Sequence, residues 1–179
     1  GLAGLGGVAL AASIVGCCNP KWLEPSPKTS TEASVAGEPF ELFDNSSALP
    51  GRSRPYASRR GTVRVTLPDT PAEAQNAWVV VAVEASVLDG GGSMMVELTM
   101  PDGTRTEARK VATSSLVFCP RPPAPCEATF GVRMTYQGAG GTGHMAWSVK
   151  ATATASAKDG KPAPAAPPTP VITTSLLAR

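Results

Sequence analysis

His144 is the only histidine of the chain, and histidine is the side chain best suited to acid–base chemistry and metal binding near neutral pH. It lies in the Gly-rich segment QGAGGTGHM, outside any HExxH metal motif. Catalysis would require a nucleophile and an orienting acid folded beside it, and the sequence contains no GxSxG motif. We therefore interpret His144 as an ordinary turn histidine, and we predict no catalytic residue, no metal site and no cofactor.

Two further sets of residues have side chains that bind ligands in other proteins. Asp89 and Asp102 lie in predicted loops and offer the oxygen atoms that Ca²⁺ prefers, but they lack the ligand spacing of a calcium loop. The rings of Trp78, Trp147 and Tyr136 could line a sugar-binding face. Tyr136 and Trp147 share strand parity with aliphatic residues, which favours a place in the core for both. The sequence does not identify a binding site.

The first eighteen residues, GLAGLGGVALAASIVGCC, carry no charge. Their apolar run, Leu5–Val15, is too short to cross a hydrocarbon core of about 30 Å, which takes about 20 residues in a helix. It has the length of the hydrophobic region of a secretory signal peptide. Because the sequence begins with Gly1, we expect the basic region that precedes such a run to be missing from it.

The run ends in Ile14-Val15-Gly16-Cys17, which resembles the lipobox of bacterial lipoproteins. The resemblance covers residues 1–18 only. It implies that residues 1–16 are a signal peptide and that Cys17 becomes the first mature residue and carries the lipid. In that family Asp at the next position retains the protein at the inner membrane, so Cys18 implies the outer membrane where the source has one. The alternatives are a cleaved signal peptide with an incidental cysteine pair and a buried apolar helix.

The four cysteines form two pairs, Cys17/Cys18 and Cys119/Cys126. An exported chain meets oxidising conditions, so the spacing of the second pair around PRPPAP predicts a disulfide. A redox-active pair would be expected to have a CxxC-like spacing, and a zinc site would need more ligands than the single histidine supplies. We expect this disulfide to join the neighbouring strands before and after its loop, and not to bridge two sheets as in antibody domains.

Residues 17–60 show no sustained helical or strand period and are interrupted by six prolines, which predicts a disordered tether. Its apolar island, residues 40–43, could dock on the domain. Four arginines, Arg52, Arg54, Arg59 and Arg60, surround Tyr56 and could contact anionic headgroups or cell-wall polymers. A solvated linker is the interpretation that we favour for this cluster.

From residue 61 to residue 157 the chain alternates apolar and polar side chains with a period of two, which indicates half-buried strands. The longest run, residues 78–88, is apolar on both faces and is predicted as a central strand, followed by a hairpin loop at residues 89–93. Residues 105–111 are polar on both faces and are predicted as an edge strand. About seven strands with short turns favour an antiparallel β-sandwich, immunoglobulin-like or of jelly-roll type.

Residues 158–179 begin as a Pro/Ala-rich, extended tail. The apolar stretch 171–177 at its end could be an extra edge strand or a peptide that binds a partner. We favour a frayed terminus for it.

The formal net charge is only +2, which gives no reason to expect nucleic acid as a partner. We therefore expect an exported, lipid-anchored protein of the bacterial cell envelope with a non-enzymatic binding or assembly role. Its partners would be the membrane, through the lipid, and an envelope protein or glycan. The alternatives are an accessory domain or subunit of an envelope enzyme and a purely structural surface protein.

Overall fold

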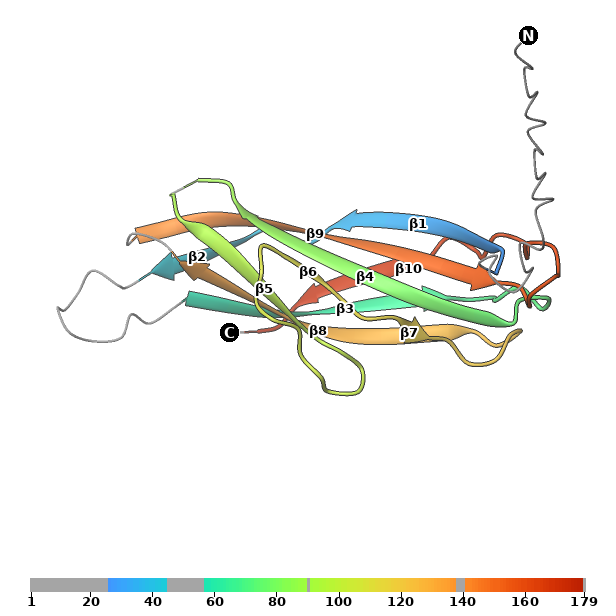
Figure 1. The fold of residues 1–179 in the computed structure, drawn as a ribbon. Helices are drawn as coiled ribbons and strands as arrows, with labels where there is room; N and C mark the ends of the chain where they lie inside the picture. Colours follow the sequence, from blue (N-terminus) through green and yellow to red (C-terminus); the bar gives the residue numbers. More distant parts are fainter. Residues whose placement is uncertain (1–25, 45–56, 90, 138–140, 179) are drawn as a thin grey trace, which may run out of the picture.

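The computed structural model describes residues 26–44, 57–89, 91–137 and 141–178. Within these ranges the chain forms ten strands and no helix. The strands make two antiparallel sheets that pack face to face as a sandwich (Figure 1). The predicted all-β sandwich is therefore confirmed. None of the described segments is a helix long and apolar enough to cross a membrane.

The larger sheet has six strands in the order β1-β9-β4-β6, with β2 also paired to β9 and β7 also paired to β4. Its strands are β1 Lys28–Ala36, β2 Phe40–Asp44, β4 Asn76–Val87, β6 Val111–Thr113, β7 Val117–Phe118 and β9 Gly141–Ser156. The smaller sheet has four strands in the order β10-β3-β8-β5. These are β3 Ala57–Leu67, β5 Ser93–Thr99, β8 Cys126–Gln137 and β10 Val171–Leu176.

The core lies between the two sheets and follows the alternation of the sequence. Side chains on one face of each central strand point into it, since successive residues of a strand face opposite sides of the sheet. β4 contributes Val79, Val81 and Val83, and β8 contributes Phe130 and Met134, all of them fully buried. β4 lies inside its sheet, between β9 on one side and β6 and β7 on the other, as predicted for the longest apolar run.

The prediction of a hairpin at residues 89–93 is wrong. β4 pairs with β9, whereas β5 pairs with β8, so the chain passes from one sheet to the other between them. The alternation of residues 78–100 shows that both segments are strands. It does not show which sheet each one joins, because both sheets bury one face against the same core.

The prediction of a disordered tether is wrong for the described part of residues 17–60. β1 pairs along all of its nine residues with β9, and β2 pairs with the beginning of the same strand. The inner face of β1 consists of small, partly buried side chains such as Thr31 and Ala33, which is why the segment lacks a strong apolar period. Backbone pairing with a long, regular neighbour orders it instead. Residues 17–25 and 45–56 lie outside the described residues.

The expected frayed terminus is also wrong, because residues 171–176 form β10, an edge strand paired with β3. The Pro/Ala-rich segment before it runs beside β1. Thr29 Oγ1 lies 3.2 Å from the carbonyl oxygen of Pro164, and Thr31 Oγ1 lies 3.1 Å from that of Pro168. The two segments predicted to lie outside the domain therefore contact each other and complete one side of the sandwich.

The predicted edge strand at residues 105–111 is mostly irregular. Arg105 and Arg109 form only isolated bridges, to Thr99 and Val96 of β5, and a short strand, β6, begins at Val111. The segment is polar on both faces, so no buried side chains hold it in a continuous register.

Candidate functional site

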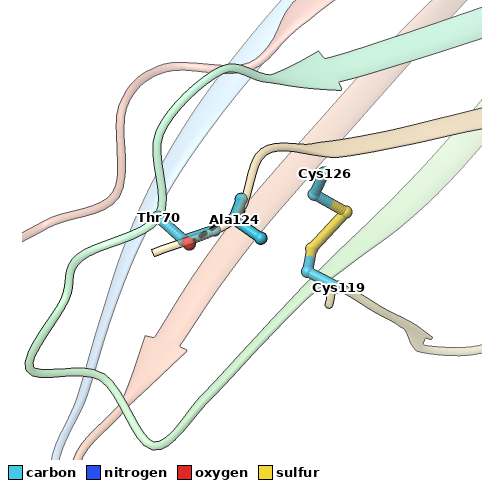
Figure 2. Close-up of a disulfide and its surroundings, with 4 residues drawn as sticks. All are labelled: Thr70, Cys119, Ala124 and Cys126. Atoms are coloured by element: carbon cyan, nitrogen blue, oxygen red, sulfur yellow. Dashed lines mark hydrogen bonds between the residues drawn. A yellow bond between two sulfur atoms is a disulfide. The ribbon is translucent and has the colours of Figure 1, made fainter. Parts of the chain in front are cut away.

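The disulfide between Cys119 and Cys126 is present, and it bridges the two sheets (Figure 2). Cys119 follows β7 and donates its backbone N–H to Ala77 of β4, in the six-stranded sheet. Cys126 is the first residue of β8, in the four-stranded sheet. The predicted pairing is therefore confirmed, but the expectation that it joins neighbouring strands of one sheet is wrong. The chain changes sheet inside the proline-rich loop.

A second contact ties this loop to the rest of the same end of the sandwich. The hydroxyl of Thr70, in the segment between β3 and β4, donates a hydrogen bond of 2.8 Å to the carbonyl oxygen of Ala124 (Figure 2). The disulfide and this hydrogen bond together fix the loop between β7 and β8 to both sheets. We assign these contacts a role in stability.

Tyr136 and Trp147 are buried core residues, as predicted from their strand parity. The Trp147 indole N–H donates to the carbonyl oxygen of Glu38 at 2.9 Å, and the Tyr136 hydroxyl donates to that of Gly91 at 2.6 Å. Gly37 packs directly against the indole ring, where an added Cβ would overlap it. Neither ring is exposed to a ligand, so a sugar-binding face made by all three predicted aromatic residues does not exist.

The side chain of Asp102 is hydrogen-bonded within its own turn. Its carboxylate accepts hydrogen bonds from the backbone N–H and the hydroxyl of Thr104, and these bonds lower the pKa of Asp102. The described residues contain no group of three or more His, Cys, Asp or Glu side chains arranged to hold a metal ion. Cys17, Arg52, Arg54 and Tyr56 lie outside the described residues.

His144 belongs to β9 and lies between two carboxylates, which the sequence does not indicate. Its Nδ1 lies 2.8 Å from the Asp89 carboxylate, and its Nε2 lies 2.8 Å from the Glu41 carboxylate. The hydrogen bond to Asp89, together with its charge and with Glu41, raises the pKa of His144. The backbone and side-chain hydrogen bonds from His144 lower the pKa of Asp89. Both ring nitrogens are engaged, so the protonated ring joins β2, β9 and the end of β4.

The clearest candidate for a binding surface is an apolar area on the outer face of the six-stranded sheet, away from the core. Trp78 lies directly opposite Phe118 in the pairing of β4 with β7, and their ring centroids are 6.2 Å apart. Phe118 is 64% exposed and Leu116, just before β7, is 50% exposed. We define the outer apolar patch as the apolar side chains on the outer face of β4, β6 and residues 116–118: Trp78, Val80, Ala82, Val111, Leu116 and Phe118. The polar Thr113 and Glu84 lie on the same face, opposite Ala82 and Val111.

A polar network borders the outer apolar patch on β9 and β1. Thr154, opposite Trp78 on β9, shares a hydrogen bond of 2.9 Å with Ser30 of β1. Lys150 forms an ion pair of 2.6 Å with Glu32. The Lys28 ammonium lies 5.6 Å from the centroid of the Trp78 ring, a cation–π distance. An apolar centre with such a border has the composition of a protein–protein contact surface.

No protein-family model matches the chain. No curated protein matches it either. Among solved structures, a similarity is found to the crystal structure of the infectious bursal disease virus VP2 subviral particle, with 11% identity and a TM-score of 0.28. The alignment covers 96% of this chain and 44% of that one, so the chain spans less than half the length of the viral protein. A similarity this low does not indicate a shared family.

Proposed function

We propose that this chain is an exported, lipid-anchored protein of the bacterial cell envelope whose β-sandwich has a non-enzymatic binding role. Its partner is a protein that docks on the outer apolar patch. The observation that carries this proposal is the exposed pair of Phe118 and Leu116 beside Trp78. Exposed apolar side chains that gather on one face favour an interaction site, since covering them with a partner removes them from water.

The types of residue in the patch favour a protein over a glycan. Tryptophan and other aromatic side chains are enriched among the residues that carry most of the binding energy in protein interfaces. Aliphatic side chains extend the surface beyond the two rings: Val80 of β4, Val111 of β6 and Leu116, which precedes β7. Sugar recognition would use the faces of the rings with hydrogen-bonding groups, and aliphatic side chains provide none.

Export and anchoring are supported by two features that are independent of the patch. The residues Ile14-Val15-Gly16-Cys17 resemble a lipobox at the end of an apolar run. The Cys119–Cys126 disulfide is a bond that persists mainly in oxidising compartments.

Site-specific photo-crosslinking of the full chain in its own envelope tests the docking proposal. A photoreactive phenylalanine analogue at position 118 is expected to give one discrete protein adduct, identified by mass spectrometry. The matched control places the analogue at Leu88, which is also 64% exposed but lies outside the patch. The substitution Leu116→Lys should abolish the adduct at position 118. No adduct, an adduct of equal yield at position 88, or an adduct with a second copy of the chain would each contradict the proposal.

A further inference from the structure

The outer side of the four-stranded sheet, on the face opposite the outer apolar patch, contains a hollow of about 190 Å³. Three arginine side chains line it: Arg60 from β3, Arg133 from β8 and Arg105 from the segment after β5. Glu97 is the one acidic residue among the described residues that line it, and these residues carry a net charge of +2. We call this feature the arginine hollow. It concentrates on one small surface a charge as large as the formal net charge of the whole chain.

Two of these arginines lie where like charges repel. Arg60 and Arg133 are direct partners in the pairing of β3 with β8, so their Cβ atoms are about 5 Å apart. Neither forms an ion pair with another described residue, and Arg105 Nη1 lies 3.9 Å from Glu97 Oε1. On the same face Arg64 is paired with Glu127 at 2.7 Å. Glu97 lies opposite Arg133 in the pairing of β8 with β5, but the ion pair that it forms is the one with Arg105. The sheet therefore pairs Arg64 closely and leaves an excess of positive charge around Arg60 and Arg133, which an external anion would stabilise.

The floor of the hollow is open because β8 has a glycine there. Gly131 lies between Thr62 of β3 and Thr99 of β5 on the outer face. A Cβ added at Gly131 would lie 3.3 Å from the Thr99 Cβ and would fill the space below the guanidinium groups. The absence of a side chain at this one position leaves room for a ligand atom.

We propose that the arginine hollow binds one oxyanion group, a carboxylate or a phosphate, of a larger acidic ligand. The planar guanidinium group matches such oxyanions with paired, charge-assisted hydrogen bonds. The volume is below the roughly 300–1,000 Å³ of sites that enclose a whole small molecule, so the hollow admits one acidic group and the rest of the ligand extends over the sheet. This site goes beyond the proposed function, since it lies on the other outer face.

Nuclear magnetic resonance titrations of the ¹⁵N-labelled protein with D-glucuronate, inorganic phosphate and D-glucose test the proposal. Saturable shifts are expected at Arg60, Gly131 and Arg133 with at least one of the two anions and not with glucose. The tighter of the two identifies the oxyanion. Arg133→Gln and Arg60→Gln should each weaken binding about tenfold or more, which is the loss expected when a charged hydrogen bond is removed.

The matched control is Arg121→Gln, which removes the same charge from the exposed disulfide loop and should leave the affinity unchanged. Gly131→Ala keeps all three arginines but occupies the floor, so it should weaken binding while thermal melting shows a folded protein. Equal losses in Arg121→Gln, an equal response to glucose, or the absence of saturable shifts would overturn the proposal. Phe118→Ser should leave the titration unchanged, which separates the failure of this proposal from the failure of the docking proposal.

Discussion

Phe130 is fully buried at the centre of β8, and its ring fills space between the two sheets. Phe130→Ala should lower the free energy of unfolding by about 3–5 kcal/mol, because the substitution removes buried apolar surface and leaves a cavity. Phe118→Ala removes the same atoms from an exposed position and should cost less than about 1 kcal/mol. Urea unfolding of the two variants measures both values. Similar losses in the two variants would contradict the assignment of inner and outer faces.

The contacts of His144 predict how its contribution to stability depends on pH. Its pKa is raised in the folded protein, so its contribution is present below its usual value of about 6.5 and is lost as the pH rises through the folded value. The pKa of Asp89 is lowered, so its contribution is present above about 3.8 and is lost as the pH falls through the folded value. Both contributions are therefore complete between about pH 4 and 6.5.

Urea unfolding of the wild type and of His144→Gln over a range of pH checks this prediction. The difference between their free energies of unfolding should be largest between about pH 4 and 6.5 and should shrink above the folded pKa of His144. Because the chain has one histidine, its ring resonances report that pKa directly. A difference that does not vary with pH would show that the carboxylates do not hold the ring in solution.

Arg59 points toward the inside of the sandwich, and its Nε and Nη1 atoms are buried without a hydrogen-bond partner among the described residues. Buried polar groups without partners cost about 1–3 kcal/mol each, and removing them while keeping the volume is neutral or stabilising. Arg59→Met should therefore leave the free energy of unfolding unchanged or raise it, whereas Arg59→Ala should lower it through lost packing of the stem. A loss above about 2 kcal/mol for Arg59→Met in urea unfolding would contradict this expectation.

The sequence identifies single residues whose side chains could bind a ligand, but it does not show which of them lie together in the fold. His144 and Asp89 both attract attention in the sequence, yet nothing in their separation of 55 residues indicates that they meet. Glu41 lies in the apolar island 40–43, whose docking on the domain was expected from Phe40 and Leu42, but nothing in the sequence indicates that its carboxylate meets His144. The arginine hollow has the same origin, because Arg60 and Arg133 are brought together only by the register of β3 with β8. Strand pairing over long distances in the chain decides such sites, and local patterns do not show it.

Among the elements, the loop between β7 and β8 gives a direct test of how the sheets are held together. Closing this loop of eight residues, 119–126, should stabilise the fold by about 2–3 kcal/mol in the chain-entropy model, and by less where its prolines already restrict the unfolded chain. The double variant Cys119→Ala/Cys126→Ala should show that loss in urea unfolding. Reductant should destabilise the wild type but not the variant. Free thiols at both positions in protein purified from the envelope would contradict the disulfide.

The elements that the sequence predicted well are those whose buried faces are large and apolar. Val79, Val81 and Val83 alternate so regularly that β4 could be placed in the centre of a sheet. The inner face of β1 has small residues such as Thr31 and Ala33, and β10 is short and follows a proline-rich segment, so the same rule assigned them to a tether and a tail. Their order comes from backbone pairing with β9 and β3, and strand propensity depends on that context.

At the scale of the whole molecule, the two proposed contact surfaces lie on opposite outer faces of one sandwich. The outer apolar patch belongs to the six-stranded sheet, and the arginine hollow belongs to the four-stranded sheet. The residues 28–36 and 171–176, at the two ends of the described chain, both add edge strands to this sandwich. Together these features suit a protein that binds an apolar partner and an acidic ligand at the same time.

The proposed anchor predicts where the molecule is held. Ile14 and Gly16 precede Cys17 at the end of an apolar run, the pattern of a lipobox, and the lipoproteins that carry it are modified at that cysteine. One acyl chain binds membranes only marginally, and stable attachment needs more than one. Cys17→Ser should abolish both acylation and processing, whereas Cys18→Ser should leave both intact.

Metabolic labelling with a clickable fatty acid measures acylation, and the mobility of the chain in gels measures processing. The wild type and Cys18→Ser are expected to take up label and to fractionate with membranes, and with the outer membrane where the source has one. Label on Cys17→Ser, or none on the wild type, would show that the chain is not anchored through Cys17. The sandwich and both proposed contact surfaces do not depend on this result, because the strands that form them begin at Lys28, after Cys17 and Cys18.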